Sequence, residues 1–505
     1  MSESFHTLLV LVLGAIGLYY YIAKKQSRVR LPPGPKGLPI IGNVADVPTE
    51  QEWKTYAEWG RKWGGIIHLS LMGQPLIILN SADIMEEFDK QGANYSDRPV
   101  LQMGGELVGF NNLLGLTRYG SRLRSYRKQF SRFVGAPKNI QSLQPLIEEE
   151  TRKFLRRTLE NSGSKKLIGN LRKLAGGIIL QLTYGYKVKD GQDEFVDLIE
   201  KNNDNFSTAL VPGAFLVDVF PWLKYMPEWL PGTGFLKSAR QWRKTIEATA
   251  DVPYTYTVNQ ITAGTASLSF VSTGLEDNEA SPSPEYLHGL KWTAASMYSG
   301  GADTTVSIEY GFFLAMVLFP EVQKKAQAEI DAVVGNDRLP SFADIPHLPY
   351  VNAVATEILR WNCVAPSGIP HSAVEDGHIN GYFIPKGAVI VANLWNMLHD
   401  PEFYPDPFKF DPERHLGPNP QRDVRKICFG FGRRICPGML LADASVYSCI
   451  AMSLAVFNIE KAVDGNGIPI TPVHDNTSGI ISFPKPYECV IKPRSEKAAS
   501  LISES

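Results

Sequence analysis

The chain has 505 residues, of which 44% are apolar and 20% charged, and its formal net charge is −1. This is the balance of an ordinary globular protein, and it argues against a disordered chain or a nucleic-acid-binding protein. The five cysteines begin only at Cys363, so the sequence predicts no disulfide framework, and a reducing compartment fits.

The N-terminus predicts a membrane anchor over residues 1–25. Residues 7–23 are a run of 17 without a charged side chain. As a helix this run would span roughly 26 Å, close to a bilayer core of about 30 Å. Basic residues follow it, which places the rest of this single-pass chain in the cytoplasm. A cleaved signal peptide is the alternative, but no small-residue cleavage site is evident and the basic residues lie on the wrong side.

Residues 26–45 predict a stiff, turning hinge between the anchor and the body. Four prolines and three glycines lie between residues 31 and 43, and such a stretch cannot continue a helix. No other segment is rich enough in Gly, Ser or Pro to divide the chain. We therefore expect one large domain over residues 46–495 and a short C-terminal tail, 496–505.

Two stretches early in this domain have a clear pattern. Residues 64–80 predict two short strands joined at Gly73, and residues 96–114 predict a variable loop. Residues 118–133 are basic and helical by pattern, with Arg127 among six cations. A charge run is usually a solvated face, and outward-facing cations could dock an acidic electron donor.

Apolar residues gather between 215 and 230 in a segment that prolines interrupt. The prolines exclude a membrane span, and an exposed apolar patch of this kind marks membrane contact or a ligand entrance. A buried helix–loop–helix corner explains the same residues equally well. Residues 262–284, rich in Ser, Thr, Pro and Gly, predict a surface loop.

Residues 288–319 predict a long helix that a proline ends. Gly300 and Gly301 lie in its interior, where each costs about 1 kcal/mol relative to alanine. A helix tolerates this cost where a ligand must come close or where the axis bulges. Asp303 and Thr304 then place an acid and an alcohol side by side in an otherwise apolar helix, and polar groups in that position need a reason.

Two shorter patterns follow the long helix. Glu357 and Arg360 are three residues apart on a predicted helix, a spacing that alone indicates only a surface ion pair. The dipeptides Asp376-Gly377 and Asn380-Gly381 predict tight hairpin turns.

Residues 429–438, F-G-F-G-R-R-I-C-P-G, carry the strongest signal. Their three glycines allow tight turns and the close approach of a flat ligand. Arg434 places a fixed charge two residues before Cys436, where it could pair with an anionic group. A thiolate-ligated haem iron requires backbone N–H groups directed at the sulfur and a cation for a propionate. A Gly-rich turn around a buried cysteine is the alternative reading of a lone cysteine, but the full pattern outweighs it.

The pattern F-x-x-G-x-R-x-C-x-G resembles, at every defining position, the haem-binding signature of the cytochrome P-450 family. Residues 300–305 also match that family's motif [AG]-G-x-[DE]-T-[TS], and the resemblance covers about residues 30–492. It implies a mainly α fold, a triangular helical prism with small β-sheets, behind one N-terminal transmembrane helix. It also implies haem b between the long helix and the cysteine loop, with the Cys436 thiolate as the iron's axial ligand.

The resemblance also assigns roles to single residues. Thr304 would hold a water and Asp303 would connect it to bulk protons, so these two are the expected catalytic pair. Leu123 stands where the family's W-x-x-x-R pattern has tryptophan, which removes one propionate donor. The expected structural lock is Glu357, Arg360 and Arg414. The expected cofactor-binding residues are Arg127, His371, Phe429, Arg434, Cys436 and Gly438, with Cys436 as the metal ligand. Possible substrate contacts are Phe110, Phe215, Ser299, Gly300, Ala365, Ile369 and Ile480.

By this resemblance the chain is a haem-thiolate monooxygenase that oxidises a lipophilic small molecule with O₂ and NADPH-derived electrons. The chain has no nicotinamide or flavin motif of its own. The expected partners are therefore a membrane-bound NADPH–cytochrome reductase and, as a second source of electrons, a cytochrome b type donor, at the endoplasmic reticulum membrane. Its motifs look most like fungal monooxygenases of secondary metabolism, with terpenoids expected first and polyketides second. Two alternatives stay open: an O₂-independent haem-thiolate isomerase or dehydratase, and a non-catalytic haem-binding sensor.

Overall fold

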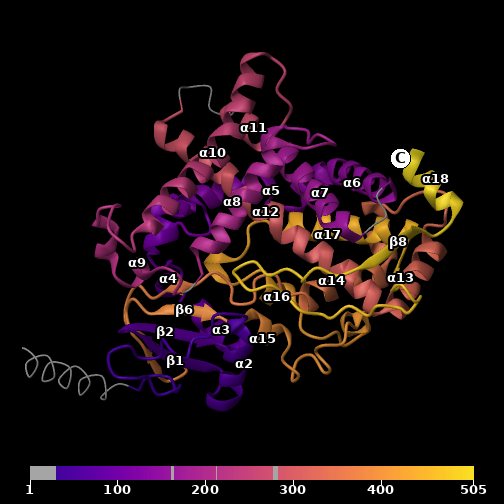
Figure 1. Cartoon of the computed structure of the whole chain (residues 1–505). Helices are drawn as coiled ribbons and strands as arrows, with labels where there is room; N and C mark the ends of the chain where they lie inside the picture. Colours follow the sequence, from indigo (N-terminus) through magenta and orange to yellow (C-terminus); the bar gives the residue numbers. More distant parts are fainter. Residues whose placement is uncertain (1–29, 161–163, 212, 277–281, 505) are drawn as a thin grey trace, which may run out of the picture.

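The computed structural model describes residues 30–160, 164–211, 213–276 and 282–504. The predicted membrane anchor, residues 1–25, lies outside them, as do residues 26–29 of the predicted hinge and 277–281 of the predicted loop. Helices form most of the described body, and the largest sheet lies at the lower left of Figure 1. The predicted mainly helical architecture with small sheets is therefore confirmed.

The longer helices build the body around α12. They are α2 (Glu52–Trp63), α3 (Ala82–Lys90), α5 (Ser121–Val134), α6 (Pro137–Glu160), α7 (Ser164–Tyr184), α8 (Glu194–Ala209), α10 (Gly234–Thr262), α12 (Pro284–Leu318), α13 (Pro320–Val333), α14 (Pro349–Trp361), α17 (Met439–Val456) and α18 (Glu496–Glu504). Shorter segments join them: α4 (Gly92–Tyr95), η1 (Gln102–Val108), η2 (Phe110–Asn112), α9 (Leu216–Val219), η3 (Pro221–Tyr225), α11 (Phe270–Glu276), η4 (Phe342–His347), α15 (Leu394–Leu398), η5 (Pro412–His415), α16 (Arg425–Cys428) and η6 (Gly432–Arg434).

The described strands form three small sheets. The strands are β1 (Ile66–Leu71), β2 (Gln74–Leu79), β3 (His371–Ser372), β4 (Gly377–Ile379), β5 (Tyr382–Ile384), β6 (Val389–Ala392), β7 (Phe457–Lys461) and β8 (Cys489–Pro493). The largest sheet has the order β1-β2-β6-β3. β1 and β2 pair antiparallel across Gly73, as the sequence predicts. A bridge between Asp97 and Ser372 then ties the sheet to the segment that follows α4, and so places His371 beside that segment.

The long helix α12 runs through the centre of the body (Figure 1). Ser283 caps its N-terminus by accepting a hydrogen bond from the Tyr286 N–H at 3.2 Å. Pro320 follows its end and opens α13, so the predicted stop is confirmed. The helix begins at Pro284, earlier than residue 288, because proline fits the first turn.

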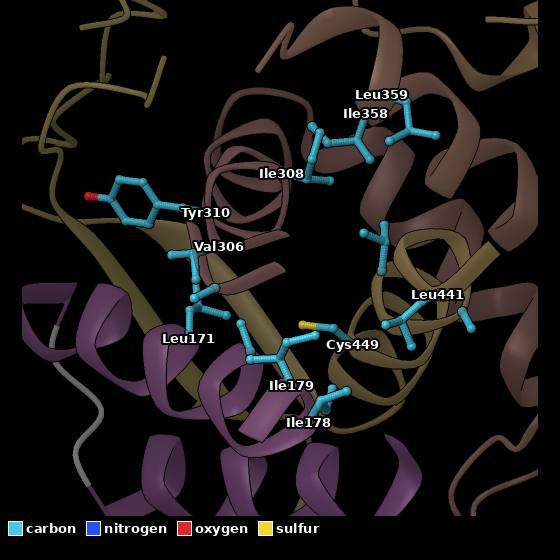
Figure 2. Close-up of a cluster of buried hydrophobic side chains, with 14 of the residues drawn as sticks. Leu171, Ile178, Ile179, Val306, Ile308, Tyr310, Ile358, Leu359, Leu441 and Cys449 are labelled. Atoms are coloured by element: carbon cyan, nitrogen blue, oxygen red, sulfur yellow. The ribbon is translucent and has the colours of Figure 1, made fainter. Parts of the chain in front are cut away.

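Apolar side chains from several helices enclose the middle of α12. Figure 2 shows Val306 and Ile308 of α12 in one apolar cluster with Leu171 and Ile179 of α7, Ile358 of α14 and Leu441 of α17. α17 is long and apolar enough to cross a membrane, but 72% of its apolar window is buried. It is therefore a core helix of the body.

Two turn and loop predictions need correction. Asn380 and Gly381 both have positive φ, 48° and 75°, and form the predicted hairpin turn between β4 and β5. Gly377 instead lies within β4, and the Asp376 carboxylate accepts a hydrogen bond from the Lys386 N–H. The prediction of a turn at Asp376-Gly377 is therefore wrong. Residues 262–284 are also not only a surface loop, because α11 lies among them and buries Phe270.

The described part of the hinge packs along the edge of β1. Asn43 is buried, donates to the Pro35 carbonyl oxygen at 3.1 Å, and accepts from the Ser70 N–H at 3.0 Å. The His68 N–H donates to the Pro33 carbonyl oxygen at 2.9 Å. These bonds hold residues 33–43 of the hinge against the sheet.

The apolar segment between 215 and 230 is largely exposed. Tyr225 is 78% and Trp229 80% exposed, and Leu216 and Trp222 are exposed as well. Only Val217 is fully buried in α9. The reading as a buried corner is therefore wrong, and the segment presents an apolar surface.

Candidate active site

The loop that carries Cys436 is held in shape by its backbone. The Cys436 N–H donates to the Phe429 carbonyl oxygen at 2.8 Å and so closes the loop. Gly430 and Gly432 have φ of 75° and 53°, a region that side chains other than glycine rarely adopt. A Cβ on Gly432 would also collide with the Asp89 carboxylate, which accepts the Gly432 N–H.

The sulfur of Cys436 lies at the start of α17. Burial raises the pKa of the Cys436 thiol overall, although the Gly438 N–H, which bonds to this sulfur, and the charge of Arg127 both lower it. The thiol therefore stays protonated unless a stronger positive charge is present. A bound metal cation would supply that charge, since a coordinating thiol loses its proton.

Arg434 is buried, and only one of its three guanidinium nitrogens has a hydrogen-bond partner among the described residues. Its Nε donates to the Ser96 carbonyl oxygen at 2.7 Å, while Nη1 and Nη2 have no hydrogen-bond partner in the described chain. Burial lowers the pKa of Arg434 to about 10, so the side chain is still charged at neutral pH. The neighbouring carboxylate of Asp97 is already engaged by Arg118 and by the Tyr119 N–H. An anionic group beside Arg434 would satisfy both nitrogens.

Arg98 and His371 add to this buried positive region. Burial and then the charge of Arg434 hold the pKa of Arg98 well below its usual value. His371 Nδ1 lies 2.7 Å from the Tyr95 carbonyl oxygen, so Nδ1 carries the hydrogen of a neutral ring. Burial, helped by Arg98 and Arg434, lowers the pKa of His371 to about 3. His371 would donate from Nε2 only after a bound anion had raised this pKa.

Arg127 of α5 lies on the outer side of the cysteine loop. Its Nη1 donates to the Ile435 carbonyl oxygen at 2.9 Å. Leu123, one turn earlier, is buried. Arg127 and Leu123 line a surface depression that reaches Cys436, with Arg124 and Lys128 along it. The helix is thus basic toward solvent and touches the loop with one arginine.

The middle of α12 opens onto free space. Gly300 is exposed although most of the helix around it is buried, and a Cβ there would meet no atom within 4 Å. Gly301 instead packs tightly on Ile179 of α7. The Thr304 hydroxyl donates to the Gly300 carbonyl oxygen at 2.8 Å. Burial raises the pKa of Asp303 to about 6, which poises this carboxyl for proton exchange near neutral pH.

Glu357, Arg360 and Arg414 meet in the core. Glu357 and Arg360 side chains are both 0% exposed, and the guanidinium donates to both carboxylate oxygens at 2.8 and 2.9 Å. Arg414 Nε lies 3.4 Å from Glu357 Oε1, and His415 Nε2 lies 2.9 Å from Oε2. Burial alone would raise the pKa of Glu357, but the bonds from His415 and Arg360 hold it below the usual value.

Most predicted substrate contacts come from segments that the fold ties together. The Leu114 N–H donates to Ser296 of α12 at 2.9 Å, which joins the segment of Phe110 to that helix. The Ser482 N–H donates to the Val364 carbonyl oxygen at 2.8 Å, which joins the segments of Ile480 and Ala365. The carbonyl of Ile369 accepts from Arg98 at 2.6 Å. Ser299 is 3.5 Å from Asn202 of α8, and the Phe215 ring packs against Trp242 of α10.

Comparison with known proteins identifies the family of this chain. The sequence profile of the family described as cytochrome P-450 matches residues 32–490. The chain belongs to the cytochrome P-450 family. The chain is 49% identical to cytochrome P-450 monooxygenase 208 of Postia placenta. The identity is counted over 496 residues, which make up 97% of this chain and 96% of the relative.

Two other fungal relatives, also cytochrome P-450 monooxygenases, are similar to this chain over nearly its whole length. The chain is 45% identical to cytochrome P-450 monooxygenase claR of Ampulloclitocybe clavipes, over 98% of this chain and 92% of the relative. It is 41% identical to cytochrome P-450 monooxygenase CLM2 of Gibberella zeae, over 98% of this chain and 95% of the relative. The chain is a cytochrome P-450 monooxygenase of the fungal kind.

A cytochrome P-450 implies a haem-thiolate, and the residues present fit one. Arg434 has two unpartnered buried nitrogens that a propionate would satisfy, and Gly300 leaves space beside α12. Sequence reasoning gave no role to Arg98, beside Arg434, or to His415, beside Glu357. Both residues reach these places through contacts with residues that are distant in the sequence. The bond from Arg98 Nε to the Gly115 carbonyl oxygen, at 2.8 Å, has no signal in sequence spacing.

Arg434→Leu is expected to weaken haem retention in this cytochrome P-450. A charge-assisted hydrogen bond contributes about 1.5–3 kcal/mol, so losing the buried guanidinium should speed haem transfer to apomyoglobin by at least about tenfold. Arg433→Leu is the control, because Arg433 is the adjacent cation and its side chain is exposed. Equal haem loss from the two variants would contradict a propionate role for Arg434.

Proposed function

We propose that Cys436 is the axial ligand of haem b in this monooxygenase. In this proposal Arg434, Arg127 and His371 hold the haem propionates, and Arg98 is a fourth residue that helps to hold them. Phe429 and Gly438 would shape the loop around the sulfur, through the Phe429 carbonyl and the Gly438 N–H. When bound, the haem supplies the activation of O₂ that no side chain can perform, and a thiolate ligand favours O–O cleavage. The protein would position the haem and the substrate, exclude water from the site and control the delivery of protons.

In this proposal Asp303 and Thr304 are the catalytic residues of the chain. The observation that carries their role is the open space at Gly300, in the middle of a buried helix, with the Thr304 hydroxyl bonded to the Gly300 carbonyl. A hydroxyl at this place can orient a water at the opening. Asp303, with a pKa of about 6, can take a proton from solvent and release it toward Thr304.

Thr304→Ala is expected to divert electrons from product to hydrogen peroxide. Without the hydroxyl, the water that delivers protons is no longer held, so hydrogen peroxide per NADPH should rise several-fold and product per NADPH should fall. Both quantities are measured in microsomes that contain the enzyme and its reductase. Thr305→Ala is the control, because Thr305 is the buried neighbour on the same helix. Unchanged product per NADPH in Thr304→Ala would count against the assigned role.

We infer that the substrate is a lipophilic small molecule of fungal secondary metabolism, a terpenoid first and a polyketide second. The exposed apolar surface of α9, η3 and the turn that follows them, with Trp222, Tyr225 and Trp229, supports uptake from a membrane. The apolar run at residues 7–23 supports a single-pass anchor in the endoplasmic reticulum. The structural lock, Glu357 with Arg360 and Arg414, would stabilise the core without taking part in chemistry.

Electrons are proposed to come from an NADPH–cytochrome reductase, with a cytochrome b type donor as a second source. The exposed cations Arg124, Lys128 and Arg433 lie along the depression that reaches Cys436, and they suit an acidic donor surface. Microsomes carrying this chain and a reductase, given a panel of terpene and polyketide skeletons, test the proposal. NADPH-dependent hydroxylated products are expected from the terpenes, and turnover of polyketides alone would reverse the order of substrates.

A further inference from the structure

The face of α5 that meets the cysteine loop has one hydrogen-bond donor fewer than the family's pattern provides. Leu123 is 1% exposed, and its side chain has no polar atom. Arg127 therefore has no companion donor one turn before it. Tyr119 stands four residues before Leu123, and Tyr119, Leu123 and Arg127 all line the depression that reaches Cys436. At this spacing of four residues, the next polar side chain on the depression is thus a phenol.

Tyr119 is held beside Arg434 by its main chain. Its N–H donates to Oδ1 of Asp97 at 2.8 Å. Arg434 Nε donates to the carbonyl oxygen of Ser96, the preceding residue, at 2.7 Å. The tyrosine and the arginine are therefore anchored on neighbouring residues of one segment. Burial lowers the pKa of Arg434, while Asp97 and Tyr119 act on this pKa in the opposite direction, so the phenol lies within electrostatic range of the guanidinium.

Two arginines fix the ring of Tyr119 and bond its oxygen from one side. The guanidinium carbons of Arg433 and Arg124 lie 5.5 and 5.9 Å from the ring centroid. Arg433 Nη1 donates a hydrogen bond to the phenol oxygen. A phenol also has one hydrogen to donate, and no residue that the structure describes accepts this hydrogen. The O–H is therefore free to bind an anion in a region rich in arginine.

We propose that Tyr119 donates a hydrogen bond from its phenol to a haem propionate and so takes the place of the tryptophan that the chain lacks at position 123. The proposal rests on the proposed function, in which Arg434 and Arg127 hold the propionates. A carboxylate has about four lone-pair sites. One propionate can therefore bind both free nitrogens of Arg434 and still accept the phenol hydrogen. Tyr119 is in this view a cofactor-binding residue that takes no part in the chemistry.

The first test compares two tyrosine variants of the purified holoenzyme. Tyr119→Phe removes only the hydroxyl, because the ring, the arginines stacked on it and the main-chain bond to Asp97 stay. The loss of a hydrogen bond to a charged group should speed haem transfer to apomyoglobin by about fivefold to tenfold. Tyr382→Phe is the matched control, because Tyr382 is also half-buried and has Arg30 over its ring at 5.0 Å, but it lies on β5. Its haem transfer should equal that of the wild type.

The second measurement reports on the propionate itself. In resonance Raman spectra, the bending band of a haem propionate moves to lower frequency when the group loses a hydrogen bond. We expect this shift in Tyr119→Phe and not in Tyr382→Phe. An unmoved band in Tyr119→Phe would overturn the proposal, whatever the rate of haem transfer.

Arg433→Leu separates a bond to haem from a purely structural role of the tyrosine. This variant removes the hydrogen bond that the phenol accepts but leaves the phenol its own hydrogen. Haem transfer and the propionate band should therefore stay close to those of the wild type. If Arg433→Leu instead matched Tyr119→Phe in both measurements, Tyr119 would act only by holding Arg433, and the proposal would be wrong.

The outcomes also separate this proposal from the proposed function. Wild-type behaviour of Tyr119→Phe, alongside rapid haem loss from Arg434→Leu, would leave the haem site as proposed and remove only Tyr119 from it. Wild-type haem retention in Arg434→Leu would instead contradict the propionate site on which the role of Tyr119 depends.

Discussion

Replacing Cys436 with serine is expected to abolish the red-shifted Soret band of the reduced CO complex and to reduce product formation to background. A serine hydroxyl does not ionise at neutral pH, so it cannot give the iron the electron-rich ligand that a thiolate provides. The helix start at Gly438 and the bond from residue 436 N–H to the Phe429 carbonyl remain available. The variant should therefore fold, and circular dichroism checks this.

Cys428→Ser is the matched control for this substitution. Cys428 lies at the end of α16, directly before the same loop, and it is a free cysteine like Cys436. Its variant should keep the CO spectrum and activity. A Cys436→Ser protein that retains the red-shifted band would mean that another residue is the axial ligand.

Glu357→Ala is expected to lower the free energy of unfolding by about 3–5 kcal/mol, because removing one partner of a buried ion pair leaves the other charge unpaired. Arg360 is 0% exposed and would keep its bonds to the carbonyl oxygens of Leu398, at 3.0 Å, and Lys409, at 3.2 Å, which carry no compensating charge. Arg414 and His415 lose the same carboxylate. Urea unfolding followed by circular dichroism measures the loss.

Glu413→Ala controls for the removal of a carboxylate. Glu413 pairs with Lys325 at an exposed position, and exposed ion pairs contribute only about 0–1 kcal/mol. If both variants lost similar stability, the group of Glu357, Arg360 and Arg414 would contribute no more to stability than an exposed ion pair does. A Glu357→Ala protein that unfolds like the wild type would contradict its structural role.

Strong local signals made much of the fold predictable from sequence. The stop of α12 before Pro320, the β1–β2 hairpin at Gly73 and the Asn380-Gly381 turn each depend on neighbouring residues only. The turn predicted at Asp376-Gly377 failed because β5 pairs residue 377 with Ile384, a contact that the dipeptide does not reveal. Likewise, α11 forms because tertiary packing buries Phe270, despite the polar composition around it.

In the candidate site, too, the residues in local motifs were predictable and those placed by long-range contacts were not. Cys436, Asp303 and Thr304 lie in motifs whose spacing is local, so the sequence could name them. Arg98 could not be found this way, because its partners are the carbonyls of Gly115, Ile369 and Pro370, which folding brings together. The exposure of Trp229 was also undecidable from composition, since a buried corner and an exposed patch use the same residues.

Electron paramagnetic resonance of the purified, oxidised wild-type protein, recorded with its absorption spectrum, tests sulfur ligation by Cys436 most directly. We predict a coloured protein whose haem iron shows the signature of an axial thiolate. A colourless protein, or one whose iron carries nitrogen in place of sulfur on that axis, would contradict the account.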